Sequence, residues 1–182
     1  MQKVLVIYAH PNPQNSTLNR ALITAAASLD GVTIRDLYQQ YPDFDIDIKA
    51  EQTLLEQADV VVFQHPLYWY SCPAIMKEWF DVVLQNGFAY GDKGSKLKGK
   101  KWLSAITTGG NHQSYSPEGK HFYLIEDFLR PFERIAVFCD MAFLPAFICH
   151  DAIHLDEQQV EVQTQQYLNQ LKKLMSGENK HA

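Results

Sequence analysis

A short polar segment near the N-terminus has the residue types that bind phosphate groups. From His10 to Asn19 the chain reads His-Pro-Asn-Pro-Gln-Asn-Ser-Thr-Leu-Asn, directly after an apolar run. Helical periodicity begins at Ser16, so the free N–H groups and the positive dipole end of a helix would face this segment. Ser16, Thr17 and Asn19, with His10 beside them, can therefore surround an anion. The alternative is that Ser16 serves only as the N-cap of the helix.

Three consecutive aromatic residues, Tyr68, Trp69 and Tyr70, follow the most apolar strand candidate. They lie in the segment His65–Ser71. Aromatic residues usually pack in a core, but a run of three in a loop is hard to bury. Their flat faces and the backbone amides around them suit a planar heteroaromatic ring.

A third segment, Thr107-Thr108-Gly109-Gly110, ends another strand candidate. Paired glycines remove side chains and let the backbone approach a ligand closely. The sequence has neither a G-x-G-x-x-G motif nor a Walker lysine motif, which disfavours a nicotinamide Rossmann site and a P-loop nucleotidase. A phosphate site, a ring platform and a backbone cradle together indicate a flavin mononucleotide (FMN) site.

These three segments meet only if the strands before them lie in one parallel sheet. Strands that are apolar on nearly every residue are covered on both faces, as in parallel α/β sheets. The expected strands are Lys3–Tyr8, Val32–Leu37, Val60–Gln64, Lys101–Thr107 and Ala146–His150. The expected helices are Ser16–Leu29, Lys49–Ala58, one from about Pro73 to Val83, Leu124–Arg134 and Asp156–Met175.

This alternation predicts an α/β fold of the flavodoxin-like kind. We expect a five-stranded parallel sheet of order 2-1-3-4-5 with helices on both faces and a ligand at the carboxyl ends of strands 1, 3 and 4. Two segments, Tyr38–Ile48 and Asn86–Lys100, are surplus to this plan. We expect the first to be irregular up to Asp47, and both to offer surface to a partner.

Composition limits the function classes. The chain has 182 residues, 46% of them apolar and 20% charged, which fits one domain over residues 1–182 with a frayed tail after about residue 176. A net charge of −5 argues against nucleic-acid binding. Three cysteines without a C-x-x-C pair indicate a reducing compartment and a cytoplasmic location. His150 and His154 fall on a strand end and a loop, so we expect no metal site.

The three segments, in register, resemble the NAD(P)H:quinone oxidoreductases with a flavodoxin-like fold. Within that group, Leu37–Ile48 and Gln64-His65-Pro66 are similar to the ancillary flavoproteins of the bacterial glutathione-gated Kef potassium-efflux systems. The resemblance runs from about Lys3 to the final helix. Tyr-x-Tyr-Ser-Cys-Pro at residues 68–73 resembles one branch of these ancillary proteins and the intact Thr-Thr-Gly-Gly the other, so the branch stays open.

The resemblance implies a role for each segment. His10 and Ser16, Thr17, Leu18 and Asn19 would hold the flavin phosphate and ribityl chain. Leu67, Tyr68, Trp69 and Tyr70 would flank the isoalloxazine, and Thr107, Thr108, Gly109 and Gly110 would line its polar edge. Tyr115 and His121 match the catalytic pair beside the flavin, although His121 can also be read as a solvated loop residue. Because FAD-binding relatives have a longer chain after the last shared helix, FMN is favoured over FAD.

Two functions follow from the resemblance. In the first, the protein is an FMN-dependent NAD(P)H dehydrogenase that passes hydride to quinones or other electrophiles. In the second, it is a regulatory subunit of a glutathione-gated potassium/proton antiporter, with vestigial redox activity; one protein can also do both. The resemblance further implies a homodimer, and a peripheral position on the cytoplasmic face of the inner membrane.

Overall fold

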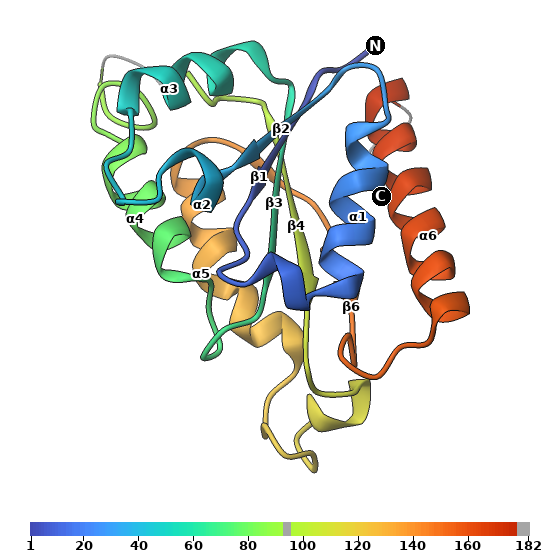
Figure 1. Ribbon diagram of the computed structural model, residues 1–182. Coiled ribbons are helices and arrows are strands. Elements are labelled where there is room, and N and C mark those ends of the chain that lie inside the picture. Colours follow the sequence, from blue (N-terminus) through green and yellow to red (C-terminus); the bar gives the residue numbers. More distant parts are fainter. Residues whose placement is uncertain (93–95, 178–182) are drawn as a thin grey trace.

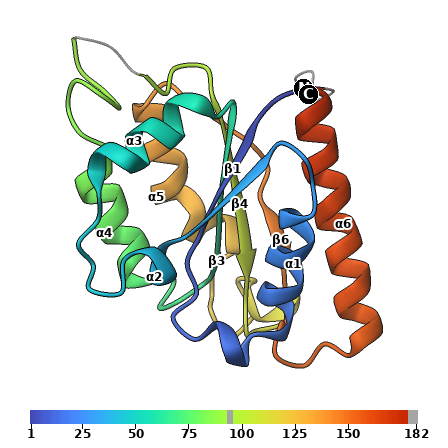
Figure 2. The ribbon, with the colours of Figure 1, turned by 45° about the horizontal axis from the view of Figure 1, so that its top comes forward.

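The structure, a computed structural model, describes residues 1–92 and 96–177 and forms a parallel sheet between two layers of helices (Figures 1 and 2). Part of the Asn86–Lys100 segment (residues 93–95) and most of the tail expected to fray (residues 178–182) lie outside the described residues. The strand order is β2-β1-β3-β4-β5, and β6 also pairs with β4. This is the expected order 2-1-3-4-5, so the flavodoxin-like fold is confirmed.

The elements fall close to the predicted ranges. The strands are β1 (Val4–Tyr8), β2 (Val32–Asp36), β3 (Val60–Pro66), β4 (Lys101–Thr107), β5 (Ala142–Phe143) and β6 (Phe147–Cys149). The α-helices are α1 (Thr17–Ala27), α2 (Leu37–Gln40), α3 (Ile48–Gln57), α4 (Ala74–Val83), α5 (Ile125–Phe138) and α6 (Glu157–Ser176). Two 3-10 turns are η1 (Pro13–Asn15) and η2 (His112–Ser114).

Two short strands, β5 and β6, occupy the position expected for the fifth strand, and β5 was not predicted. Both run parallel to β4, with Trp102 opposite Phe143 and Ala105 opposite Phe147. Pro145 lies between them and has no N–H to give to the ladder. The edge of the sheet therefore breaks at this proline, and only β6 lies within the predicted range.

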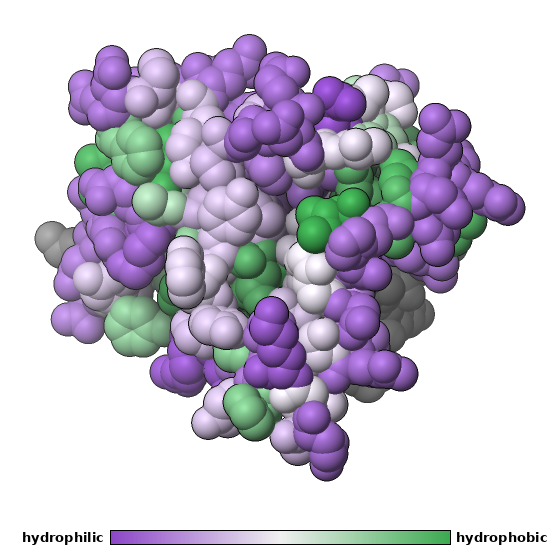
Figure 3. Space-filling model, turned by 60° about the horizontal axis from the view of Figure 1, so that its bottom comes forward, coloured by the Kyte–Doolittle hydropathy of each residue, from purple (hydrophilic) through white to green (hydrophobic). Residues whose placement is uncertain are grey.

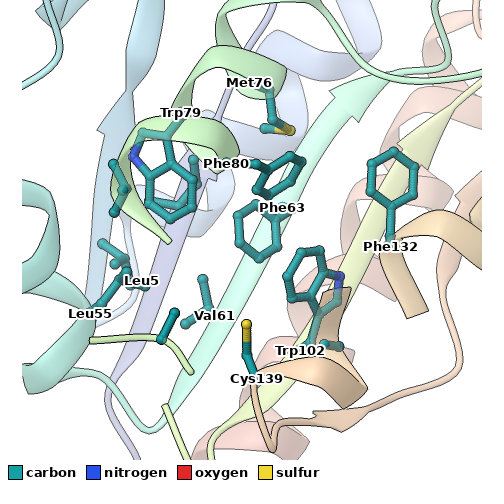
Figure 4. Close-up of a cluster of buried hydrophobic side chains, with 14 of the residues drawn as sticks. Leu5, Leu55, Val61, Phe63, Met76, Trp79, Phe80, Trp102, Phe132 and Cys139 are labelled. Atoms are coloured by element: carbon teal, nitrogen blue, oxygen red, sulfur yellow. The ribbon is translucent and has the colours of Figure 1, made fainter. Parts of the chain in front are cut away.

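The buried core lies on both faces of the sheet because side chains of a strand alternate between faces. Along β3, Val61 and Phe63 join the cluster under α3, α4 and α5, whereas Val60 and Val62 join the one under α1 and α6. Phe63 is central to the first cluster (Figure 4): its ring centroid lies 3.9 Å from that of Trp102. These fully covered strands hold the carboxyl ends of β1, β3 and β4 in fixed register.

The segment after β2 is more ordered than expected. Its first residues form the short helix α2, because the Asp36 side chain accepts a hydrogen bond from the Gln39 amide and caps it. Tyr41 and Ile46 are buried. The expectation of an irregular segment is thus wrong at its start, and Tyr41 and Ile46 belong to the core, whereas most of the other residues of the segment are exposed.

A buried charge fixes the same segment to the helices. Glu51 of α3 is fully buried and accepts hydrogen bonds from Tyr41 Oη at 2.6 Å and from Trp79 Nε1 at 2.8 Å. Arg35 Nε donates to the same carboxylate. Because each oxygen has a donor, the carboxylate is stable in the core and ties β2 to α3 and α4.

Candidate functional site

The ends of β1, β3 and β4 meet at one edge of the sheet, at the lower end of Figure 1. In register, Tyr8 lies beside Gln64, and Pro66 beside Thr107. The amide of Leu67 donates to the carbonyl of Thr107 at 2.8 Å, so the second and third segments touch. The structure therefore brings the loops after the three strands together.

The first segment joins this edge through Asn19. Its Nδ2 donates to Thr107 Oγ1 at 2.8 Å and to Ser16 Oγ at 3.1 Å. Ser16 takes the N-cap position of α1, but its side chain makes no capping hydrogen bond. Among the described residues, the amides of Thr17, Leu18 and Asn19 have no hydrogen-bond acceptor. The start of α1 thus presents free N–H groups, which is what an anion requires.

Two further residues of the first segment are buried. Leu18 packs its side chain into the core under α1 and α6, so it offers the site only its backbone. His10 accepts a hydrogen bond from the Asn12 amide at Nδ1 (3.1 Å), and its ring meets the Tyr68 ring edge-on at 6.2 Å. Burial lowers the pKa of His10, so the imidazole is neutral near pH 7.

The aromatic segment forms a tight turn that points its tip outward. Tyr68 and Ser71 exchange both backbone hydrogen bonds, at 3.2 and 2.9 Å. The two residues between them have left-handed backbones, with φ of 47° at Trp69 and 63° at Tyr70. The Trp69 side chain is 93% exposed, whereas Tyr70 stacks on Phe128 of α5 at 5.0 Å. The expectation that these rings are hard to bury is confirmed.

The expected pair after β4 forms a stacked unit. The rings of Tyr115 and His121 lie 4.4 Å apart at 26°. Tyr70 Oη lies 3.4 Å from His121 Nδ1, which links the pair to the aromatic turn. A Cβ at Gly110 would lie 3.2 Å from Tyr115 and 3.3 Å from His121, so the glycine makes room for both rings. Burial raises the pKa of Tyr115, and its phenol stays protonated at neutral pH.

Two residues at this edge were missing from the sequence prediction. His150 follows β6, and its Nδ1 lies 3.1 Å from Thr108 Oγ1. Phe128 lies under Tyr70, Tyr115 and Tyr123. The rule that ligand sites lie at the carboxyl ends of strands could have found His150, because it is the first residue after the last strand.

The family comparison agrees with the strand order and with the position of the site. The profile of the family described as "Flavodoxin-like fold" matches residues 2–174. The chain belongs to the flavodoxin-like fold family.

This flavodoxin-like chain has curated and structural relatives. It is 49% identical over 165 residues to the glutathione-regulated potassium-efflux system ancillary protein KefG of Pectobacterium carotovorum subsp. carotovorum (strain PC1), covering 91% of this chain and 90% of the relative. General stress protein 14 of Treponema denticola, in complex with FMN, superposes with a TM-score of 0.90 at 39% identity over 94% of this chain and 99% of that one. An NADPH-quinone reductase from P. pentosaceus superposes with a TM-score of 0.84 at 29% identity, over 93% of this chain and 97% of that one. The resemblance noted in the sequence is thus confirmed.

The site of the flavodoxin-like chain is an open rim. Seen end-on in Figure 3, this end has weakly polar and apolar side chains at its centre and hydrophilic ones over most of its margin. A cavity of about 460 Å³ lies beside the first segment, lined by Tyr8, Pro13, Gln14, Arg20, Ile23, Asp36, Tyr38 and Gln39. None of the expected site residues lines that cavity. Among the described residues, no helix has the length and apolarity to cross a membrane.

Proposed function

We propose that the protein is an FMN-dependent NAD(P)H:quinone oxidoreductase. The observation that carries this proposal is the meeting of three chain segments at one rim, with free N–H groups, exposed rings and a Tyr–His pair side by side. The FMN-bound general stress protein 14 and the NADPH-quinone reductase, whose folds match over nearly the whole chain, support it.

The residues at the rim fit an FMN molecule. The unpaired amides of Thr17, Leu18 and Asn19 and the Ser16 hydroxyl would hold the phosphate. A Cβ built at Gly109 meets nothing within 4 Å, so a flat ring has room against this backbone. Leu67–Tyr70 would flank that ring, and Thr107, Thr108 and Gly110 would line its polar edge. FMN is proposed rather than FAD because the matched general stress protein 14 holds FMN.

The chemistry divides between cofactor and protein. When bound, FMN would supply the two-electron hydride chemistry between NAD(P)H and a quinone, and the quinone would take up one proton in addition to the hydride to give a hydroquinone. The Tyr115 phenol, kept protonated by burial, donates a hydrogen bond where negative charge develops. His121 stacks on Tyr115 and contacts Tyr70, so the imidazole is held at the same place.

A second function is favoured by the KefG relatives. We propose that the protein also serves as an ancillary subunit of a glutathione-regulated potassium-efflux antiporter, on the cytoplasmic face of the inner membrane. The relative with this name is 49% identical over most of both chains. We further propose a homodimer that pairs through the aromatic rim, defined as Trp69, Phe122, Tyr123 and Leu124, whose side chains are 49–93% exposed.

An absorbance spectrum of the purified protein tests the first function. We expect a yellow protein whose extracted cofactor has the mass of FMN, which bleaches with NADH or NADPH and recolours with a quinone. Tyr115→Phe should lower turnover about tenfold or more while FMN stays bound, because only the donor is lost. A colourless protein that takes up no added FMN would sink the enzyme proposal.

The ancillary function is separable from the enzyme. Tyr115→Phe should leave activation of a co-expressed antiporter unchanged if the fold alone docks. Potassium efflux from intact cells is the measurement. Loss of activation together with turnover would mean that regulation depends on the redox reaction.

A further inference from the structure

The hydroxyl of Thr108 has two hydrogen-bond partners at the centre of the rim. Its Oγ1 lies 2.7 Å from the Gly110 carbonyl oxygen and 3.1 Å from His150 Nδ1. The Gly110 backbone that it holds lies directly against the rings of Tyr115 and His121. The rings of Tyr115 and His150 lie 5.5 Å apart, so the three side chains form one contiguous cluster.

Counting protons fixes the direction of each hydrogen bond. Two oxygens 2.7 Å apart need a proton between them, and a carbonyl has none to give, so Thr108 donates to Gly110. A hydroxyl has one proton and two acceptor lone pairs. Thr108 Oγ1 therefore accepts from its other partner, the His150 ring. His150 must carry its proton on Nδ1.

The contact between Thr108 and His150 joins the ends of two neighbouring strands, β4 and β6. The amide of Thr108 donates to the Cys149 carbonyl at 2.9 Å, and the amide of Asp151 donates to the Gly110 carbonyl at 3.0 Å. His150 is thus held in place by backbone bonds on both sides of it. Burial, and then the nearby His112, lower the pKa of His150, so the ring is neutral near pH 7.

We propose that His150 is a positioning residue: its Nδ1–H holds the Thr108 hydroxyl, which in turn holds the Gly110 carbonyl and with it the Gly109–Gly110 turn, against which the Tyr115 and His121 rings lie. The importance of this for catalysis rests on the function proposed above. His150 acts through Thr108. Without the His150 donor, the Thr108 hydroxyl loses one of its two partners, and the Gly109–Gly110 turn is held less firmly.

The protonated nitrogen can be measured without any cofactor. In the flavin-free full chain labelled with ¹⁵N-histidine, at pH 8, we expect the His150 signal to be that of the Nδ1–H form. The signal is assigned by its loss in His150→Asn. Thr108→Val keeps the shape of the side chain and removes the hydroxyl. In this variant the His150 signal should no longer be that of the Nδ1–H form alone. A wild-type His150 protonated on Nε2 would overturn the proposal.

Two variants distinguish positioning from mere packing. Asn carries its N–H₂ on Cγ, as His carries Nδ1, whereas Gln places its N–H₂ one bond farther away. His150→Asn should therefore keep the FMN dissociation constant and the turnover number within about twofold of wild type. His150→Gln should weaken FMN binding about two- to tenfold, the equivalent of one hydrogen bond. It should also lower the turnover number about tenfold, because a displaced Gly110 moves the Tyr115 and His121 rings that lie against it.

The control is His154→Asn, a neighbouring exposed histidine that bonds to Asp151 and not to Thr108. It should match wild type in all these measurements. The proposal would be contradicted if His150→Asn and His150→Gln lost FMN affinity and turnover equally at unchanged thermal midpoints. It would also be contradicted if both variants kept wild-type FMN affinity and turnover. If the wild-type chain binds no FMN, the proposed function fails, and the histidine ¹⁵N measurement still decides whether His150 holds Thr108.

Discussion

Two adjacent glycines of the rim have different reasons to be glycine. A Cβ on Gly110 would press on Tyr115 and His121 at 3.2 and 3.3 Å. A Cβ on Gly109 would meet no protein atom within 4 Å. The protein itself therefore tolerates a side chain at Gly109, and a restriction there would come from a ligand.

Gly109→Ala tests the ligand side of the rim. We expect the thermal midpoint to stay as in wild type, since nothing is displaced, while the dissociation constant for FMN rises at least about fivefold, as a forced methyl costs about 1 kcal/mol or more. Fluorescence quenching of FMN on titration with apo-protein measures this. Gly110→Ala serves as comparison, because it should lower turnover by moving the Tyr–His pair. FMN binding to Gly109→Ala as tight as to wild type would place the ring elsewhere.

At the scale of elements, the aromatic turn is strained where it is most exposed. Trp69 and Tyr70 both have positive φ, which costs a residue with a Cβ about 1–2 kcal/mol. Tyr70 recovers part of this by stacking on Phe128. Trp69, at 93% exposure, has no such compensation among the described residues. A turn of this shape prefers Asn and Gly, so the tryptophan is held here against local stability.

Trp69→Asn should make the protein more stable. Asn adopts the left-handed conformation at lower cost, so we expect the free energy of unfolding in urea to rise by about 1 kcal/mol. Tyr70→Asn is the matched comparison: the same strain is relieved, but the stacking on Phe128 is lost, and stability should fall. A destabilised Trp69→Asn would mean that the exposed ring makes contacts that stabilise the fold.

The elements that the sequence predicts well are those with strong periodicity. Lys101–Thr107 matches β4 at both ends, because its apolar side chains are buried on both faces. The errors have local causes: a four-residue helix, α2, is too short to show a period, and Pro145 divides a strand whose two halves both look apolar. Helix α5 extends beyond Arg134 to Phe138 because Ile135 and Ala136 continue its apolar stripe.

The site also contains residues that the sequence can place and residues that it cannot. Its three segments follow strands and could be placed from the sequence by the strand order alone. The contact of His150 with Thr108 could not, because 42 residues separate them and only the pairing of β4 with β6 brings them together. The stacking of Tyr70 on Phe128 likewise depends on how α5 packs against the turn, which no spacing reveals.

At the scale of the whole molecule, one buried histidine makes stability depend on pH. His65 is 1% exposed, and its Nδ1 lies 2.9 Å from the Pro66 carbonyl oxygen. Burial lowers the pKa of His65 to about 4. An unfolded chain binds a proton at this histidine near pH 6.5, and the folded protein does so only near pH 4. Folding therefore loses free energy as the pH falls through this window.

Removing His65 should flatten that dependence. Between pH 7 and pH 4 the wild-type protein should lose on the order of 3 kcal/mol at this residue. His65→Asn should be less stable at pH 7, since its smaller side chain leaves Phe132 with fewer contacts, but should lose less on acidification. Urea unfolding at several pH values measures both, and the two stability curves should converge toward pH 4. Parallel curves would contradict the pKa of His65.

If the protein dimerises through the aromatic rim, a charge placed in that surface should lower the molecular mass measured in solution. Phe122 is 71% exposed and has a φ of 61°, which Asp tolerates. Phe122→Asp should keep the fold and raise the dimer dissociation constant about a hundredfold by placing a charge in the interface. Val162→Asp on α6, a similarly exposed apolar site, should leave the dimer intact. Sedimentation equilibrium decides; a Phe122→Asp dimer as tight as wild type places the interface elsewhere.

The break at Pro145 also protects the molecule from fibril formation. In the part of the chain that the structure describes, the sheet continues beyond β4 only as Ala142–Phe143 and Phe147–Cys149. Its other border, β2, has five residues and ends in Arg35 and Asp36. Neither border gives an incoming chain a long, uncharged ladder of amides and carbonyls to extend. Growth of a continuous sheet from molecule to molecule is thereby blocked.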